Sequence, residues 1–343
     1  MHEQLKPAVE QLLNGQDLTA DETFRCIGAI MDGECDVIDI SAFLTAIAAR
    51  GVVADELVGA ARAMRQRAAK IACHRRPVLD TCGTGGDRLH TFNISTATAL
   101  VAASCGVSVA KHGNRSVSSS SGSADVLETL GVNISLNPEQ AGQCLEEIGI
   151  AFCFAPLIHG AMKHAAPVRR QLGFPTIFNL LGPLTNPAGA EFQIVGASTT
   201  ERARLLATAL SQLECQRAFV VCGHNQLDEI SLWGRTAVFE VITGQVRSFE
   251  WCAADFGLPE CQVSDLTVSS ATDSAEIIKT ILAGTDGPAL NMVLANTAAA
   301  LMVSGRVSTL TAGVDAARAA TKSGAASDLL SRLRHRTHAL AGT

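Results

Sequence analysis

The stretch that decides the fold is "DTCGTGGDRLHTFNIST", which runs from Asp80 to Thr96. A short apolar run precedes it and a longer one follows it, which predicts a strand, a glycine loop and a helix. The three glycines let the backbone approach a ligand and turn its amides inward. The polar residues from Asn93 onward present free amides and hydroxyls at a helix start, where anions bind. An ordinary glycine turn followed by a helix cap explains the same residues, so the stretch alone leaves both interpretations open.

Two standard nucleotide-binding motifs are absent from this stretch. The dinucleotide motif G-x-G-x-x-G fails because Arg88 stands where the third glycine is required. The Walker loop fails because no Lys-Ser or Lys-Thr pair follows the glycines. An anion site is therefore possible here, but one of a different type.

The pattern of apolar residues changes along the chain at about Pro77. Before it, residues 1 to 70 read as short helices, with a capping box at Thr19–Glu22 and an N-cap at Ser41 for a helix that ends at Gly51. After it, short apolar runs alternate with helices, which indicates a largely parallel sheet. The strand candidates are Val78-Leu79, VSVAKHGN, AFCFAP, QIVGAS, RAFVVCG and AVFEVI. The fold class is therefore predicted to be α/β, with a small N-terminal helical domain and a larger domain whose mostly parallel central sheet is flanked by helices.

Composition narrows the class of protein. The 343 residues are 47% hydrophobic and carry a net charge of −6, with 4% aromatics and no tyrosine. This acidic balance and the scarcity of stacking side chains argue against nucleic acid as a partner, and no apolar run is long enough to make a membrane a partner. The 11 cysteines are scattered without C-x-x-C spacing, which argues against a zinc site and a disulfide framework. We expect a cytoplasmic protein with reduced thiols.

Three further clusters favour an anionic substrate. Lys111 to Asp125, "KHGNRSVSSSSGSAD", follows a strand and combines cations, glycines and serines ahead of a helix start, as in a second anion loop. Asp228-Glu229 follows another strand and supplies hard oxygen ligands for Mg²⁺, or is a solvated turn. Arg169 is either a surface residue or, inside a pocket, a planar fork that binds a carboxylate.

These clusters together resemble one family. Gly83-Thr84-Gly85-Gly86-Asp87, Asn93 to Thr96, Lys111 to Arg115, Gly122 to Glu128, Asp228-Glu229 and "FNLLGPLTNPA" are similar, in this order, to the anthranilate phosphoribosyltransferases of tryptophan biosynthesis. The resemblance extends over essentially the whole chain. Each motif is moderately specific alone, and their order and spacing together are highly specific.

The resemblance implies a fold, a reaction and partners. It implies the fold class that also contains the pyrimidine nucleoside phosphorylases, with a helical dimerisation domain at residues 1–72, a helical contribution from about 165–190, and a phosphoribosyl-transfer domain at 73–343. It implies a pentosyltransferase that moves the phosphoribosyl group of 5-phosphoribosyl-1-pyrophosphate (PRPP) to the amine of anthranilate. The implied cofactor is Mg²⁺, up to two ions per monomer, and the implied assembly is a homodimer.

The resemblance also assigns site residues. Those implied for anthranilate are Gly83, Asn114 and Arg169, and those implied for metal are Ser95, Asp228 and Glu229. Those implied for PRPP are Gly83, Gly86, Asp87, Thr91, Asn93, Ile94, Ser95, Thr96, Lys111, His112, Gly113, Asn114, Arg115, Ser116, Val117, Ser118, Ser119 and Ser123. The chain departs from the family pattern at Gly160, Ser120 and Gln226, which puts the wall of the acceptor channel and one cation near the phosphate loop in doubt.

The implied reaction displaces pyrophosphate at the ribose C1 carbon. An aromatic amine is already neutral at pH 7, so positioning and electrostatic stabilisation are expected to dominate over general-base catalysis. His112 is either an acid or base or a residue that orients its loop. Two alternatives remain: a pyrimidine nucleoside phosphorylase, which lacks the Lys111 to Arg115 motif and serine loop, and a nucleic-acid-binding paralogue, against which the acidic charge and Asp228-Glu229 argue.

Overall fold

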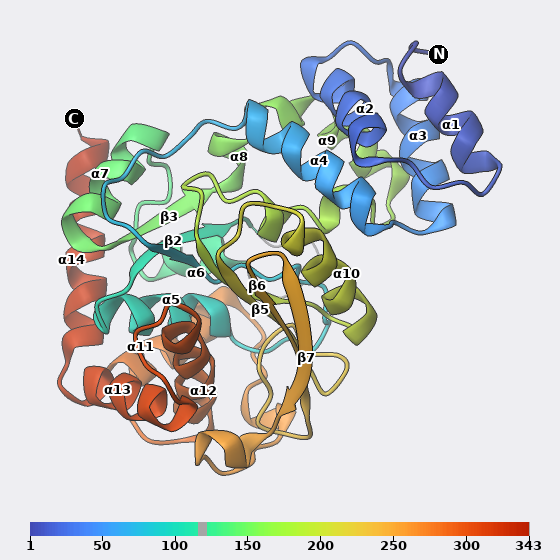
Figure 1. Cartoon of the computed structure of the whole chain (residues 1–343). Helices are drawn as coiled ribbons and strands as arrows, with labels where there is room; N and C mark the ends of the chain where they lie inside the picture. Colours follow the sequence, from blue (N-terminus) through green and yellow to red (C-terminus); the bar gives the residue numbers. More distant parts are fainter. Residues whose placement is uncertain (116–121, 343) are drawn as a thin grey trace.

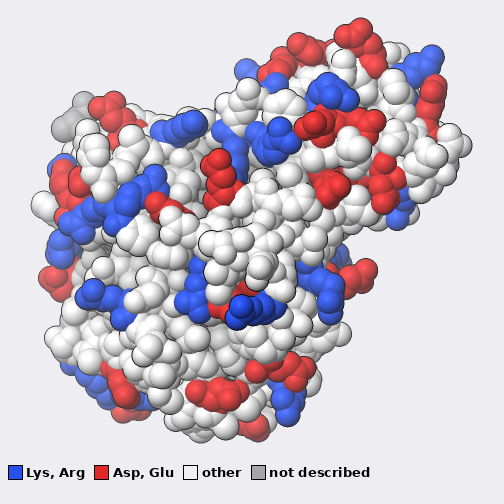
Figure 2. Space-filling view, viewed as in Figure 1, with Lys and Arg blue, Asp and Glu red and all other residues white. Residues whose placement is uncertain are grey.

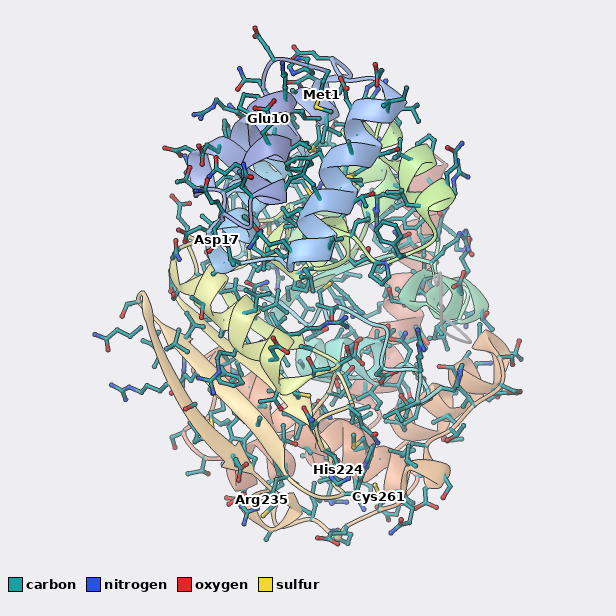
Figure 3. The ribbon with its side chains drawn as sticks, turned by 90° about the vertical axis from the view of Figure 1, so that its right-hand side faces the viewer. Met1, Glu10, Asp17, His224, Arg235 and Cys261 are labelled. Atoms are coloured by element: carbon teal, nitrogen blue, oxygen red, sulfur yellow. The ribbon has the colours of Figure 1, made fainter. Side chains whose placement is uncertain are left out.

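The computed structural model describes residues 1–115 and 122–342. A small bundle of four helices stands at one end of the molecule and a larger α/β domain forms the rest, so the predicted fold class is confirmed (Figure 1). The bundle helices are α1 Leu5–Leu13, α2 Ala20–Asp32, α3 Val37–Arg50 and α4 Ala54–Arg67. In the side view, Met1, Glu10 and Asp17 lie at the opposite end from His224, Arg235 and Cys261 (Figure 3).

Local capping explains where the bundle helices begin. The predicted capping box is confirmed, because Thr19 Oγ1 accepts from the Glu22 amide and Glu22 accepts from the Thr19 amide at 2.9 Å. The prediction of Ser41 as an N-cap is wrong. Asp36 caps α3 by accepting from the Asp39 amide at 2.8 Å, so the helix begins four residues before Ser41. The Ser41 hydroxyl instead donates within the helix, at 2.6 Å to the Val37 carbonyl.

The larger domain is built on a seven-stranded sheet in the order β3-β2-β1-β4-β5-β6-β7. The strands are β1 Val78–Asp80, β2 Ser108–Gly113, β3 Ile150–Phe154, β4 Phe192–Gly196, β5 Arg217–Gly223, β6 Thr236–Ile242 and β7 Gln245–Trp251. β3, β2, β1, β4 and β5 are parallel, and β6 and β7 form an antiparallel hairpin at one edge. All six predicted strands are confirmed, and β7 was missed because six of its seven residues are exposed.

Helices cover both faces of this sheet. The long ones are α5 Ile94–Ser104, α7 Pro138–Ile148, α10 Thr200–Ser211, α11 Ala271–Leu282, α12 Pro288–Val303, α13 Leu310–Lys322 and α14 Ala325–Ala341, and the short ones are α6 Ser123–Thr129, α8 Ala155–Ile158 and α9 Ala166–Leu172. Along β5, Phe219 and Val221 pack with α5 and α12 on one face. Ala218 and Val220 pack on the other face with α10 and the core of the helical bundle, because successive side chains alternate. The bundle therefore continues one layer of the α/β domain.

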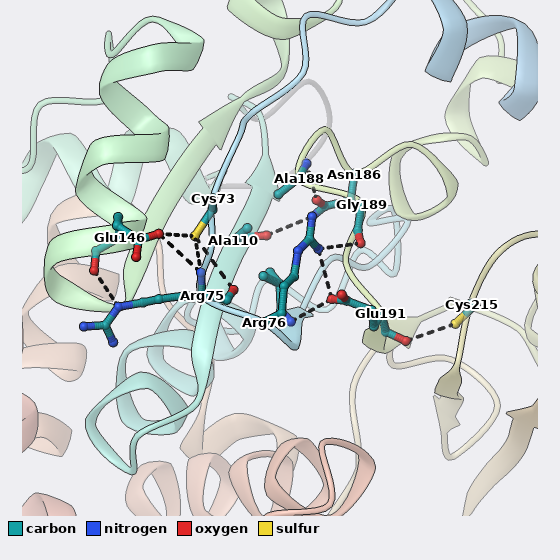
Figure 4. Close-up of polar contacts among 11 residues, drawn as sticks. Cys73, Arg75, Arg76, Ala110, Glu146, Asn186, Ala188, Gly189, Glu191 and Cys215 are labelled. Atoms are coloured by element: carbon teal, nitrogen blue, oxygen red, sulfur yellow. Dashed lines mark hydrogen bonds and ion pairs between the residues drawn. The ribbon is translucent and has the colours of Figure 1, made fainter.

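Two chain segments join the domains. In the first, the Cys73 thiol and the His74 amide contact Glu146, and Arg76 donates to Glu191 at 3.1 Å (Figure 4). In the second, Ala165, Val168 and Ile177 return from the α/β domain into the core of the bundle. The first set of contacts fixes the end of the linker on the α/β domain, and the packing of the second segment attaches the bundle to that domain.

Charged side chains of both signs alternate over the visible face of the molecule (Figure 2). Several form pairs, such as Arg62 with Asp21 at 3.0 Å. No helix within residues 1–115 and 122–342 combines the length and apolar character needed to cross a membrane.

Candidate active site

Loops that follow the parallel strands surround one cavity of about 660 Å³. The glycine loop follows β1, the Lys111–Arg115 segment ends β2, and Asp228-Glu229 follows β5. The segment from Ala155 to Asn179, which returns to the helical bundle, forms another wall. Because these strands are parallel, their carboxyl ends meet at the same edge, where ligands of open α/β sheets bind.

The glycine loop needs its glycines for backbone conformation. Gly85 and Gly86 have φ angles of 68° and 84°, in the left-handed region that favours glycine. The Gly85 amide donates to Asp228 Oδ2 at 2.8 Å. The loop then leads to Asn93, whose side chain caps α5 by accepting from the Thr96 amide at 3.1 Å. The glycine loop and the start of α5 therefore line the cavity from one side.

Buried and paired cations stand on the β2 side. Lys111 is buried, and its ammonium donates to the Thr81 carbonyl at 3.0 Å and to Ser95 Oγ at 3.1 Å. Arg115 extends away from it and donates to Asp125 at 3.0 Å and to Glu128 Oε1 at 2.8 Å. Lys111 is thus fixed at the start of α5, whereas Arg115 is held by α6 in this conformation.

Three carboxylates, those of Asp87, Asp228 and Glu229, lie close together at the cavity. Desolvation, and then the charge of Asp87, raise the pKa of Asp228 above its ordinary value. Desolvation, and then the charge of Asp228, raise the pKa of Glu229 well above its ordinary value. Carboxylates that repel one another in a desolvated place are stabilised by a cation, so these oxygens suit Mg²⁺.

Arg169 stands on the opposite wall, on α9. Its guanidinium carbon lies 5.3 Å from the Phe178 ring centroid, and Nη2 donates to Asn179 Oδ1 at 3.4 Å. Burial lowers its pKa, and Nε has no hydrogen-bond partner among the described residues. No carboxylate in residues 1–115 or 122–342 lies within salt-bridge distance of it. This half-buried, uncompensated fork is suited to the carboxylate of a ligand.

The structure brings almost all described site residues together. Those lining the cavity are Gly83, Gly86, Asp87, Thr91, Asn93, Ile94, Ser95, Lys111, His112, Gly113, Asn114, Arg115, Ser123, Arg169, Asp228 and Glu229. Thr96 is not among them: its side chain is buried on the side of α5 that faces Leu127 and Phe152. The predictions for Ser116, Val117, Ser118 and Ser119, and the departure at Ser120, lie outside the described residues.

The other two departures have different positions. Gly160 lines the cavity, and a Cβ atom there would meet nothing within 4 Å, so the wall is open at this point. Gln226 is exposed in the turn before Asp228 and does not line the cavity.

His159 is a cavity residue that the sequence did not reveal. Its ring centroid lies 5.2 Å from that of His112, and neither of its ring nitrogens has a partner among the described residues. Burial, and then the charge of His112, lower the pKa of His159 to about 3, so it is neutral at pH 7. Nothing in its local sequence marks it, because its environment comes from β2, a separate segment.

A helical bundle joined to an α/β domain with anion-binding loops defines a class of pentosyl-transferring enzymes. Two family models match the chain: "Glycosyl transferase family, helical bundle domain" over residues 6–68 and "Glycosyl transferase family, a/b domain" over residues 75–327. An anthranilate phosphoribosyltransferase of Desulfatibacillum aliphaticivorans is 48% identical over 93% of this chain and 94% of its own. One from Moorella thermoacetica is 46% identical over 94% and 95%.

Solved structures agree with these relatives. The anthranilate phosphoribosyltransferase of Thermus thermophilus superposes with a TM-score of 0.91 at 39% identity, over 96% of this chain and 99% of that one. The Saccharomyces cerevisiae enzyme in complex with PRPP and Mg superposes with a TM-score of 0.90 at 28% identity, over 98% and 100%. The chain belongs to the anthranilate phosphoribosyltransferase family, and the resemblance seen in its sequence is confirmed.

Proposed function

We propose that this protein transfers the phosphoribosyl group of PRPP to the amine of anthranilate, which gives N-(5-phosphoribosyl)anthranilate and pyrophosphate in tryptophan biosynthesis. The observation that carries the proposal is one cavity with a desolvated carboxylate cluster on one wall and the uncompensated Arg169 on the other. The first suits a metal-bound diphosphate and the second suits an aromatic carboxylate. The yeast relative is described in complexes with PRPP and Mg and with 4-fluoroanthranilate, which supports both halves.

On the donor side, we assign the diphosphate to the glycine-loop amides, the start of α5 and Lys111. Asp228, Glu229 and Ser95 would hold Mg²⁺, up to two ions, since their oxygens are hard ligands at the same wall. Bound there, Mg²⁺ would neutralise negative charge on the leaving diphosphate. Lys111 adds a fixed positive charge beside Ser95, in a position that requires no reorganisation during the reaction.

On the acceptor side, we assign the anthranilate carboxylate to Arg169 and the ring and amine to the space near Asn114 and Gly83. The amine is neutral at pH 7, so the protein has to hold it against C1 and exclude water. His112 and His159 stand beside this space, and burial lowers the pKa of both rings. Because the amine is already neutral, neither histidine has to remove a proton from it before it attacks C1.

Loss of anthranilate fluorescence tests this function. Purified protein with PRPP and Mg²⁺ is expected to consume anthranilate and to release one pyrophosphate for each molecule consumed. Omitting PRPP provides the control. A folded protein that leaves anthranilate unchanged under these conditions contradicts the proposal, and phosphate-dependent cleavage of a pyrimidine nucleoside would favour the phosphorylase alternative.

We also propose a homodimer that forms through the helical domain, with the domain boundary near residue 72, and a cytoplasmic location. Large apolar side chains are exposed on α1 and α3: Leu13 is 74% exposed, Val37 54% and Ile38 76%. Such a group on a small bundle is typical of a protein contact surface.

Charged substitutions in this surface are expected to separate the protomers. Leu13→Asp combined with Ile38→Asp places two desolvated charges in the contact, so the mass measured by light scattering should fall from dimer to monomer. Val246→Asp, on the exposed edge strand β7, is the matched control and should remain dimeric. A double variant that stays dimeric while folded would assign the contact to another surface.

A further inference from the structure

A second group of metal-ligand side chains lies behind the glycine loop. Asp80, Cys82 and His112 each offer one ligand atom, and these atoms all lie within 4.8 Å of one another. The local geometry explains the grouping: residues two apart on an extended chain face the same side, which places Asp80 beside Cys82. Leu79 pairs with Val109 in the parallel register, and the His112 amide on β2 donates to Asp80 Oδ1 at 3.0 Å, which holds His112 beside the end of β1.

Two atoms in this cluster are buried and lack a partner. Asp80 is 0% exposed and His112 is 3% exposed. Asp80 Oδ1 accepts from the His112 amide at 3.0 Å, whereas Asp80 Oδ2 and His112 Nε2 have no hydrogen-bond partner among the described residues. The side-chain amide of the neighbouring Asn186 donates to the Ala110 carbonyl at 2.8 Å and also interacts with the Asp80 carboxylate, so His112 Nε2 is the atom of the cluster with no polar contact at all among the described residues. Buried polar atoms are nearly always paired, so His112 Nε2, beside an Asp80 oxygen without a close partner, indicates a missing ligand.

The histidine is already in the form that binds a metal. His112 Nδ1 lies 3.0 Å from the Gly182 carbonyl oxygen. Because a carbonyl only accepts, Nδ1 carries the proton and Nε2 presents its lone pair. Burial lowers the pKa of His112, which keeps the ring neutral. A backbone carbonyl that fixes the tautomer in this way is typical of metal-bound histidines.

The donor set selects a soft cation. A thiolate, an imidazole and a carboxylate suit Zn²⁺, whereas Mg²⁺ prefers oxygen ligands such as those of Asp228 and Glu229. Donor atoms of a tetrahedral zinc site lie about 3.5 Å apart, given metal–ligand bonds of roughly 2.0–2.3 Å, so small side-chain rotations would close the site. Cys82 and His112 line the substrate cavity, which provides an entry path and leaves the fourth ligand position facing the cavity.

The sequence argued against zinc because no two cysteines have C-x-x-C spacing. The cluster contains a single cysteine, and its three ligands come from the end of β1, the residue next to the glycine loop, and β2. Only the pairing of the two strands brings them together. The spacing rule therefore could not detect this arrangement.

We propose that Asp80, Cys82 and His112 form a site for a thiophilic divalent cation such as Zn²⁺, and that its occupancy inhibits the transferase. Binding replaces the Cys82 proton, which is released to solvent as the zinc–thiolate bond forms. The ion would bind His112 Nε2, and its fourth coordination position would face the cavity next to Gly83. A ligand in that position would block the space that the acceptor has to enter. The inhibitory part rests on the proposed function, whereas the site itself does not.

Co²⁺, a spectroscopic substitute for Zn²⁺, tests the site directly. Protein freed of transition metals is titrated with Co²⁺ in excess Mg²⁺, and we expect one equivalent to bind with a cobalt–thiolate charge-transfer band that Zn²⁺ abolishes by displacement. Cys82→Ala should lose the band. Asp80→Asn, which keeps an oxygen for the His112 amide, should weaken binding at least about tenfold. Cys252→Ser, which removes a more accessible thiol, is the matched control and should behave like the parent.

Activity supplies the second measurement. Zn²⁺ should inhibit the parent and Cys252→Ser in excess Mg²⁺, whereas Cys82→Ala should resist it. A charge-transfer band that persists in folded Cys82→Ala, or disappears in Cys252→Ser, overturns the site. If the cobalt band behaves as expected but Zn²⁺ does not lower the transferase activity of the parent, the site stands and only the proposed inhibition is wrong. If the parent shows no transferase activity, the cobalt band still decides the site, so the two proposals fail separately.

Discussion

Asp228→Asn combined with Glu229→Gln is expected to remove Mg²⁺-dependent transfer while stabilising the metal-free protein. Both substitutions keep an oxygen in the same place, so the amide oxygen introduced by Asp228→Asn can still accept the hydrogen bond from the Gly85 amide, which is 2.8 Å long in the structure. Both remove the negative charge that would attract the metal. Losing a metal that neutralises the leaving diphosphate should lower kcat/KM by about 10³-fold or more.

The gain in stability follows from the raised pKa values. Desolvation and mutual repulsion raise the folded-state pKa of both carboxyl groups above their unfolded values. Their ionisation therefore opposes folding increasingly as the pH rises through the folded-state pKa values. Neutral amides remove this penalty, and we expect the Tm of metal-free protein at pH 8 to rise by on the order of 2 °C.

A Mg²⁺ titration of the activity and a pair of thermal melts check this prediction. Initial rates measured against Mg²⁺ concentration should show no saturation in the double variant, and thermal melts with and without Mg²⁺ should coincide. Glu260→Gln, at an exposed position, is the control and should match the parent in both. An unchanged metal titration would show that Asp228 and Glu229 do not bind the metal, and the metal assignment would be wrong.

Local signals explain what the sequence predicted well. The strand, glycine loop and helix around Gly85 are adjacent in the chain, and their conformations depend on φ angles and caps that neighbouring residues determine. The carboxyl ends of β1, β2 and β5 meet because parallel strands require it. The alternation pattern predicted the parallel sheet, and the family resemblance implied one site for Lys111 and Asp228, which are 117 positions apart in the printed sequence and line the same cavity.

Long-range packing explains the rest. Asp36 was overlooked as a cap because Ser41 has equal propensity, and the choice depends on which apolar face enters the bundle core. β7 lies at the sheet edge with little buried surface, so it has no hydrophobic pattern to detect. The pairing of His159 with His112, and of Cys82 with Asp80 and His112, arises only when separate strands come together.

Arg169→Ala is expected to raise the KM for anthranilate by about 100-fold and the KM for PRPP by less than about threefold. The guanidinium would bind the carboxylate in both the ground state and the transition state, so its loss affects KM far more than kcat. A charge-assisted hydrogen bond in a half-buried site contributes about 1.5–3 kcal/mol, which corresponds to roughly 10- to 150-fold in binding.

We do not expect Arg169→Ala to impair folding, because Arg169 is a half-buried cation without a carboxylate partner among the described residues, so its removal breaks no ion pair. Burial lowers its pKa, so alanine should leave the Tm of unliganded protein unchanged or higher. Arg170→Ala, the exposed neighbour on α9, is the matched control and should retain both KM values. Arg169→Lys should recover only part of the affinity, since an ammonium lacks the planar fork. Equal increases in both KM values would remove Arg169 from the acceptor site and leave the cavity wall between Gly160 and Phe178 without an assigned ligand.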